Sequence, residues 1–255
     1  MTGYLYDGSF DGFLSCVFES YARKEQPSII QTPEQEQPFL LALTSIATCP
    51  DKAKRVRNGL KRLSEEVWEM IRDGFLCDCM NNREVSLLRL IHQLFRYGPS
   101  AAVNYADPDV NTVCKALRAM RNEAHLLTGF VRFSEYNGVL VSVISPKNQV
   151  LPILAQHFSI RFPGEQFMIY DQNHRTAFMH TPQKKEFIEI ESLTLPPIGK
   201  EEAAFRAMWR SYFDHVAIAQ RENPVCQRTH LAMRYRPWMT EFMDQQQENA
   251  YQLTE

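Results

Sequence analysis

The sequence predicts an α+β protein in which amphipathic helices pack around a small, mainly antiparallel sheet. Helical apolar periodicity fills most of the first 128 residues and returns near the C-terminus, whereas short β-rich runs are concentrated between residues 130 and 190. Such segregation is typical of an α+β fold and not of a doubly wound parallel sheet. With 255 residues, of which 44% are hydrophobic, the chain can bury a substantial core.

The N-terminal half begins with a short strand and then becomes mainly helical. Tyr4–Tyr6 is expected to form the strand, which the Asp7-Gly8 pair ends in a turn. Ser9 can cap the following helix because its hydroxyl accepts a backbone N–H. Residues 25–38 are polar, contain prolines and are predicted to form a loop. A strand is predicted over residues 39–46, and helices are predicted over residues 51–67, 84–96 and 109–128.

The C-terminal half contains the predicted sheet. Two apolar runs, Phe130–Phe133 and Val139–Ile144, flank Asn137-Gly138, which is a strong indication of a β-hairpin. Further strands are predicted over residues 167–170, 176–180 and 187–190, and helices over residues 151–161 and 201–219. The last helix is expected to bury the apolar face that is formed by Phe205, Met208, Trp209, Tyr212, Phe213 and Val216.

The domain organisation and the compartment follow from composition. We expect one compact domain over residues 1–245, with a weak boundary near Asp107 and a frayed polar tail over residues 246–255. The first residues lack the basic and apolar regions of a signal peptide, and no stretch approaches about 18 apolar residues. We therefore expect a cytoplasmic protein without a membrane segment. The formal net charge of −2 argues against broad coating by nucleic acid, so any such contact requires a local basic patch.

Motifs of the common enzyme classes are absent from the sequence. It lacks the glycine-rich loops that bind dinucleotides or nucleoside triphosphates, the HExxH metal motif and the GxSxG nucleophile elbow. Cys77 and Cys79 lie close together, but no second Cys or His pair has the spacing of a zinc site. The six cysteines also lack the tight run that an iron–sulfur cluster requires. The sequence therefore predicts no metal and no cofactor, and it does not decide whether the protein is an enzyme.

Glu123 and His125 are the first candidates for acid–base chemistry. They lie two positions apart on a predicted helix, so they point about 200° away from each other and do not form a pair by themselves. We expect Glu123 to be half-buried and paired with an arginine. His125 is expected to be exposed beside Arg121.

A second candidate group surrounds the predicted helix over residues 151–161. His157 and Arg161 lie four positions apart and share one helix face. In one interpretation they line a polar cleft together with Asp171 and Arg175. In the other they form an ordinary solvated face, and Asp171–His174 is a turn.

Basic residues offer further candidates for contact with nucleic acid. Two helices carry basic stripes, formed by Arg118, Arg121 and His125 and by Lys54, Arg57 and Lys61. Such side chains suit phosphate oxygens, but each stripe alone can also be the ordinary charged face of an amphipathic helix. Near the C-terminus, Arg234, Tyr235 and Trp238 combine charge with aromatic rings, a mixture that binds single-stranded nucleic acid. Their alternative is a packed terminal helix whose arginines reach the solvent.

Several short segments, taken in order, resemble a bacterial family of DNA-metabolism proteins. They are residues 6–13 (YDGSFDGF), Glu123-Ala-His125 with 129–133 (GFVRF), residues 150–152 (VLP), His157-Phe158 with Arg161-Phe162, Tyr170-Asp171 with Arg175, and Asn223-Pro224 with Tyr235, Trp238 and Glu241. The similarity covers residues 3–242. One departure lies near the C-terminus, where the family carries a Tyr-Trp pair and this chain has two residues between Tyr235 and Trp238.

The resemblance implies a process and a partner. Members of the family are typically encoded beside a radical-SAM protein of DNA-repair type, and related domains are fused to uracil-DNA glycosylase-like domains. The activity of the domain itself is not established in the family. DNA metabolism or repair is therefore the implied process, and the radical-SAM protein is the implied partner.

Three functions are consistent with these observations. The first, which we favour, is a non-catalytic module that binds or presents DNA, with contacts from Arg118, Arg121, His125, Arg132, Arg161, Arg175, Arg234, Tyr235 and Trp238. The second is a DNA-processing hydrolase, either a nuclease or a base-processing enzyme, with acid–base candidates Asp7, Glu123, His125, His157 and Asp171. The third is a pure protein–protein adaptor for the radical-SAM partner, which would expose an apolar patch.

Overall fold

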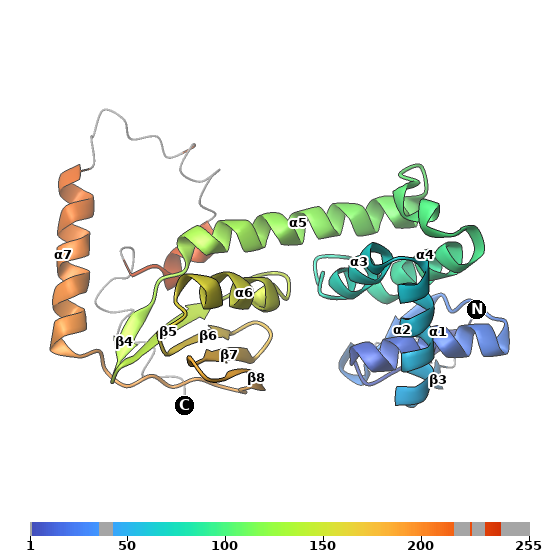
Figure 1. The fold of residues 1–255 in the computed structure, drawn as a ribbon, viewed down its shortest axis with the longest axis horizontal. Coiled ribbons are helices and arrows are strands. Elements are labelled where there is room, and N and C mark those ends of the chain that lie inside the picture. The colour runs from blue at the N-terminus through green and yellow to red at the C-terminus, as the bar shows by residue number, and fades with distance from the viewer. Residues whose placement is uncertain (1, 36–42, 217–224, 226–232, 241–255) are drawn as a thin grey trace. The chain divides into compact units, whose positions relative to one another are not determined.

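The computed structural model confirms the α+β fold (Figure 1). It describes residues 2–35, 43–216, 225 and 233–240. The chain contains two compact units, the N-terminal unit (Met1–Met120) and the C-terminal unit (Arg121–Glu255), and each is described by itself. The expected single domain over residues 1–245 stays a prediction, and the expected frayed tail lies outside the described residues.

The N-terminal unit combines helices with a three-stranded parallel sheet. Its elements are β1 (Gly3–Leu5), α1 (Phe10–Arg23), β2 (Ile29–Gln31), η1 (Pro33–Gln35), β3 (Leu43–Ser45), α2 (Pro50–Leu63), α3 (Glu65–Phe75), α4 (Arg83–Tyr97), η2 (Pro99–Val103) and the first part of α5 (Pro108–Phe130). β1 lies between β2 and β3, and Gly3 stands opposite Ile29 and Leu43. Parallel sheets are usually covered on both faces, which agrees with the complete burial of Tyr4 on the central strand.

Side-chain hydrogen bonds fix the turn between β1 and α1. Ser9 Oγ accepts from the N–H of Gly12 at 2.9 Å, which confirms the predicted helix cap. Asp7 accepts from the N–H and the hydroxyl of Ser9 at 3.0 and 2.7 Å, and from the hydroxyl of Thr48 at 2.6 Å. Although burial opposes it, these hydrogen bonds hold the pKa of Asp7 below its ordinary value. The contacts of Asp7 are therefore those of a residue that ties the β1–α1 turn to the segment after β3.

Two predictions for the N-terminal unit were wrong. β2 lies inside the segment that was predicted to be a loop, because its three residues are too few to show a periodic pattern. The predicted helix over residues 51–67 is two helices, since Ser64 has an extended backbone and its hydroxyl caps α3 by accepting from the N–H of Glu66 at 3.1 Å. The strand predicted over residues 39–46 is described only from Leu43 onward, where β3 forms.

The C-terminal unit contains a five-stranded sheet. After the end of α5 its elements are β4 (Ser134–Tyr136), β5 (Val139–Ile144), α6 (Leu151–Arg161), β6 (Phe167–Asp171), β7 (Thr176–His180), β8 (Lys185–Glu189), α7 (Lys200–Val216) and η4 (Met233–Trp238). The strands follow the order β4-β5-β6-β7-β8, and only the pairing of β5 with β6 is parallel. This sheet is therefore mainly antiparallel, as predicted.

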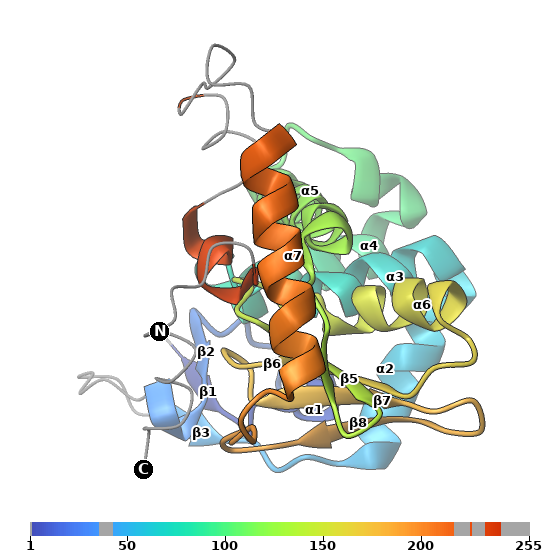
Figure 2. The same cartoon turned by 90° about the vertical axis from the view of Figure 1, so that its left-hand side faces the viewer.

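The parallel pair gives the sheet one distinctive edge. α6 connects β5 to β6 and packs on β6 and β7, so both parallel strands end at the same edge of the sheet (Figures 1 and 2). We call this the β5–β6 edge and define it by two segments, Ser145–Asn148 after β5 and Asp171–Arg175 at the end of β6. The carboxyl ends of parallel strands are where ligands commonly bind in α/β sheets. This edge is therefore the first place to look for a site.

Two predictions for the C-terminal unit also need correction. Phe130–Phe133 is not a strand, because α5 continues to Phe130 and the hairpin strand begins at Ser134. The predicted core face of α7 is exposed: the five of its residues whose burial is described have exposed fractions of 44 to 66%. Among the residues of α7 whose burial is described, Arg206 is the buried one, and its guanidinium donates to the hydroxyl of Ser134 at 2.6 Å.

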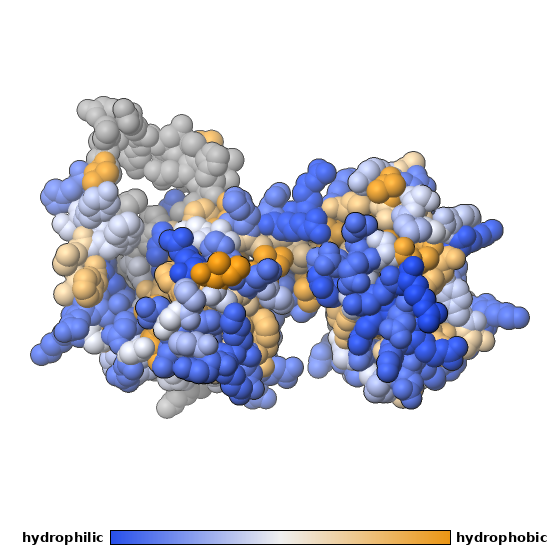
Figure 3. Space-filling view, in the orientation of Figure 1, coloured by the Kyte–Doolittle hydropathy of each residue, from blue (hydrophilic) through white to orange (hydrophobic). Residues whose placement is uncertain are grey.

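Figure 3 shows apolar side chains over α7 at the left of the view.

No helix in the described part of the chain combines the length and the apolar character that crossing a membrane requires.

Candidate functional site

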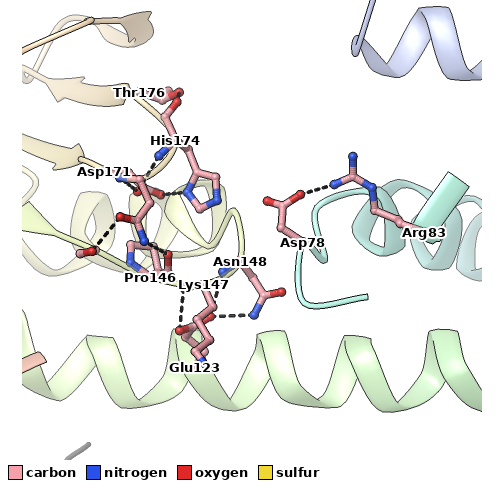
Figure 4. Close-up of polar contacts among 11 residues, drawn as sticks. Asp78, Arg83, Glu123, Pro146, Lys147, Asn148, Asp171, His174 and Thr176 are labelled. Atoms are coloured by element: carbon pink, nitrogen blue, oxygen red, sulfur yellow. Dashed lines mark hydrogen bonds and ion pairs between the residues drawn. The ribbon is translucent and has the colours of Figure 1, made fainter. Parts of the chain in front are cut away.

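Glu123 is a buried hydrogen-bond acceptor at the centre of the C-terminal unit. Its side chain is 4% exposed, and it accepts five hydrogen bonds (Figure 4 shows those from residues 147 and 148). Oε1 accepts from the N–H of Lys147, from Arg234 and from the hydroxyl of Tyr235, at 3.0, 3.0 and 2.9 Å. Oε2 accepts from the N–H and the side-chain amide of Asn148, at 3.0 and 2.7 Å. Glu123 therefore joins α5, the segment after β5 and η4.

Asn173 connects the two segments of the β5–β6 edge. Its side-chain amide donates to the carbonyl of Pro146 at 2.7 Å, and its Oδ1 accepts from the hydroxyl of Ser145 at 2.9 Å. A backbone hydrogen bond of 3.0 Å from Gln172 to Ile144 adds to this connection. The edge is therefore one hydrogen-bonded structure, in which each segment holds the other.

Asp171 holds the imidazole of His174 at the same edge. Asp171 is 1% exposed, and its Oδ2 lies 2.6 Å from Nδ1 of His174. Its Oδ1 accepts from the N–H groups of Asn173 and His174 at 3.1 and 3.2 Å. Burial raises the pKa of the Asp171 carboxyl above its ordinary value, and the hydrogen bond from His174 opposes this rise. A buried carboxylate in this position fixes the orientation of the imidazole ring.

Three exposed cations belong to the β5–β6 edge or bind Glu123. Lys147 is exposed, although its N–H is bound to Glu123. Arg175 is exposed in the turn after β6, where it has a left-handed backbone with φ of 52°. Arg234 bonds to the same oxygen of Glu123 as Lys147 does, and its side chain is 40% exposed.

The acid–base candidates of the C-terminal unit do not contact one another. Asp7 lies in the N-terminal unit, whereas the other four lie in the C-terminal unit. Among these five, which are all described, no hydrogen bond or ion pair joins any two. Glu123 is paired with an arginine, as predicted, but it is buried rather than half-buried. His125 is exposed on α5, which agrees with the prediction, and His157 is exposed on α6.

Of the two interpretations of His157, Arg161, Asp171 and Arg175, the shared polar cleft does not form. α6 runs from the C-terminal end of β5 back to the N-terminal end of β6, so its last residue, Arg161, lies at the opposite edge of the sheet from Arg175. The guanidinium of Arg161 lies 5.6 Å from the ring of Phe162. Only Asp171 and Arg175 of that predicted group belong to the β5–β6 edge.

The remaining nucleic-acid candidates differ in their exposure. Arg118 and Arg121 are exposed on α5, in the N-terminal and C-terminal units respectively. Arg132 is half-buried and donates to the carbonyls of residues 129 and 131 at 2.9 and 3.3 Å. Tyr235 is buried, and burial raises the pKa of its hydroxyl to about 12. Its ring therefore cannot stack on a base, whereas Trp238 is half-buried.

Four residues of the edge were missed in the sequence. They are Lys147, Asn148, Asn173 and His174. Asp171 was named as a possible cleft residue or as part of a turn, but its pairing with His174 was not predicted. Nothing in the sequence indicates that residues 145–148 lie beside residues 171–175, because that proximity depends on the parallel pairing of β5 with β6.

A metal centre is not formed by the described residues. No group of three or more His, Cys, Asp or Glu side chains among them has a geometry that could hold a metal ion. Cys77 is buried, and burial raises the pKa of its thiol to about 12. Cys79 is exposed.

Comparison of the sequence with known protein families places the chain in a family of unknown activity. The fold and the β5–β6 edge define an α+β protein with a cationic, hydrogen-bonded edge on a mixed sheet. Residues 81–241 match the family model described as a domain of unknown function, DUF4130, and the chain belongs to this family. No curated protein matches the chain.

Proposed function

We propose that this protein is a cytoplasmic, non-catalytic DNA-binding or scaffolding module that acts in DNA metabolism or repair with a radical-SAM partner. The β5–β6 edge is its site for the phosphate backbone. The observation that carries this proposal is the gathering of the exposed cations Lys147, Arg175 and Arg234 on backbone segments that Glu123 and Asn173 join by hydrogen bonds. The process and the partner come from the family resemblance.

The physical basis is the fit between this edge and phosphate groups. Arginine and lysine bind phosphate oxygens through charge-assisted hydrogen bonds, and a cation held on a fixed backbone loses less entropy on binding. The exposed Arg118, Arg121 and His125 on α5 extend the set of proposed contacts. Because the net charge is −2, binding depends on these local groups and is sensitive to salt.

The test of the edge is a salt titration of DNA binding. Fluorescence anisotropy is measured with short single-stranded, duplex and uracil-containing DNA for the wild type and for the double variant Lys147→Ala/Arg175→Ala. The slope of log affinity against log salt is expected to fall by about two, since each lost phosphate contact lowers it by about one. A preference among the three DNAs would indicate the substrate of the associated repair system.

The matched control lies in the same sheet. Lys184 and Lys185 are exposed at the opposite edge, because β7 runs antiparallel to β6 and His180 stands opposite Phe167. The double variant Lys184→Ala/Lys185→Ala is expected to keep the wild-type slope. If both double variants have the same slope as the wild type, the β5–β6 edge does not bind DNA.

The exposed face of α7 supports a second candidate function, that of a protein–protein adaptor. Phe205, Met208 and Tyr212 are 65, 66 and 58% exposed, although they lie on one face of the helix. The opposite side attaches α7 to the sheet, since Arg206 pairs with Glu202 at 2.8 Å and binds Ser134. An exposed apolar face of this kind is a common feature of protein interaction sites.

The adaptor function makes a separate prediction. In a pull-down with the purified radical-SAM protein, the variant Phe205→Ser/Met208→Ser is expected to lose most of the binding, because a desolvated apolar contact is lost at each position. DNA binding is expected to be unchanged. Phe187→Ser, at a phenylalanine that is 50% exposed on β8, is the control. Equal capture of wild type and α7 variant would argue against this surface.

A further inference from the structure

The N-terminal unit contains a groove of about 970 Å³ between α1, α4, η2 and the start of α5. Its lining includes Tyr21, Arg89, His92, Arg96, Tyr97 and Asn104, and we call it the Tyr97 groove. The volume is near the upper end of the range of small-molecule sites, about 300–1,000 Å³. The groove lies outside the C-terminal unit, so the proposed DNA edge does not account for it.

One face of α4 supplies the polar side of the groove. Arg89, His92, Gln93 and Arg96 follow the i, i+3, i+4, i+7 spacing that places side chains on one face of a helix. The other face of α4 is buried in the core through residues that include Leu87, Leu90, Ile91 and Leu94. The polar face can therefore contact a ligand without any change in the packing of the core.

Two aromatic side chains present ring surfaces to the groove. The ring of Tyr21 stacks on that of His92 with 4.1 Å between centroids and 7° between planes, and Tyr21 is still 43% exposed. Ser20 Oγ lies 2.9 Å from Nε2 of His92 and helps to hold this stack. Burial lowers the pKa of His92, so the stacked pair is mainly uncharged near neutral pH. Tyr97 is 62% exposed.

Arg96 is the cation of the groove that remains available. Its guanidinium lies 5.1 Å from the centroid of the Tyr97 ring, and it has no ion pair or hydrogen bond with any described residue. Arg89 lies 3.8 Å from Asp109. The nearby Asp107 is already used, because it caps α5 and accepts from Gln93 at 2.9 Å. The acidic residues of the groove therefore do not neutralise Arg96.

We propose that the Tyr97 groove binds a nucleotide through its base. The base stacks on Tyr97 or on the Tyr21–His92 pair, Arg96 binds the phosphate, and the exposed amide of Asn104 hydrogen-bonds the edge of the base. Aromatic rings combined with arginine recognise unpaired bases in this way, since every base has a π-face. The ligand is either a free nucleotide or an unpaired base within a single strand. This site goes beyond the proposed phosphate contacts of the β5–β6 edge and does not depend on them.

The experiment uses the full chain with two probes. The first is a short single-stranded oligonucleotide that contains 2-aminopurine, whose fluorescence is quenched when the base stacks on an aromatic ring. The second is a set of four nucleoside monophosphates measured by calorimetry. The variant Tyr97→Ala is expected to weaken binding of whichever probe the wild type binds by about tenfold, because one stacking contact is lost. With the oligonucleotide it is also expected to reduce the quenching of 2-aminopurine. Arg96→Gln is also expected to weaken this binding, because both probes carry phosphate.

The controls separate this site from other contacts. Tyr105 is also 62% exposed but does not line the groove, so Tyr105→Ala is expected to behave like the wild type. Lys147→Ala/Arg175→Ala is expected to lower the salt slope while the quenching at saturation stays unchanged. Binding of mononucleotides alone supports a free nucleotide as ligand, and binding of the oligonucleotide alone supports a single strand. The proposal is overturned if neither probe binds, or if Tyr97→Ala binds both as tightly as Tyr105→Ala does.

Discussion

Replacing Glu123 with alanine is expected to destabilise the C-terminal unit by about 3–5 kcal/mol, because each buried donor that loses its acceptor costs about 1–3 kcal/mol. Five hydrogen bonds end on this carboxylate, and the substitution leaves their donors without a partner. The buried hydroxyl of Tyr235 and the buried amide of Asn148 bear most of this cost, because water does not reach them readily. The segment after β5 and η4 are expected to loosen together.

Hydrogen exchange followed by mass spectrometry is the appropriate measurement, since its peptides report on the two units separately. Peptides that cover residues 143–150 and 233–240 are expected to lose protection, whereas peptides of β1 and α1 keep it. Glu123→Gln retains the shape and part of the hydrogen bonding and is expected to cost less. Glu165→Ala, at an exposed glutamate of the same unit, is the control. Wild-type protection in Glu123→Ala would show that this network does not support the edge.

Replacing Glu84 with alanine is expected to destabilise the N-terminal unit by about 3 kcal/mol, for the same physical reason. Glu84 is buried and accepts from the hydroxyl of Tyr6 at 2.9 Å and from Arg83 at 2.8 Å. Burial and Glu84 together raise the pKa of Tyr6, so this tyrosine remains a neutral donor. Without the carboxylate, a buried hydroxyl and a largely buried guanidinium each lose an acceptor.

Urea unfolding that is followed by circular dichroism and by hydrogen exchange would measure this effect. Tyr6→Phe removes only the donor and is expected to cost about 1 kcal/mol, the net value of one ordinary hydrogen bond. Arg83 keeps its ion pair with Asp78 in both variants, which limits the loss. If Glu84→Ala is no less stable than Tyr6→Phe, the ion pair with Arg83 contributes nothing to the unit.

Local chemistry explains which elements were predictable. The hydroxyl of Ser9 caps α1, and the Asn137-Gly138 pair adopts the positive φ values of 53° and 87° that the hairpin turn requires. The helix predicted over residues 151–161 has the observed bounds of α6. These features depend on a few neighbouring residues, so they can be read from the sequence. Helical periodicity placed Glu123 only at the margin of the apolar face of α5, and its full burial depends on the segments that pack over it.

The tertiary structure alone determined the candidate site. The segments 145–148 and 171–175 meet because β5 and β6 pair in parallel, and no local pattern specifies the partner of a short strand. The same reason explains why Arg161 and Arg175, which seemed to belong together, lie at opposite edges. For α7, burial was predicted where the structure shows exposure. Its sequence is amphipathic, but periodicity indicates only that one face is apolar. Whether that face packs inside the protein depends on the rest of the fold, and in α7 it remains exposed.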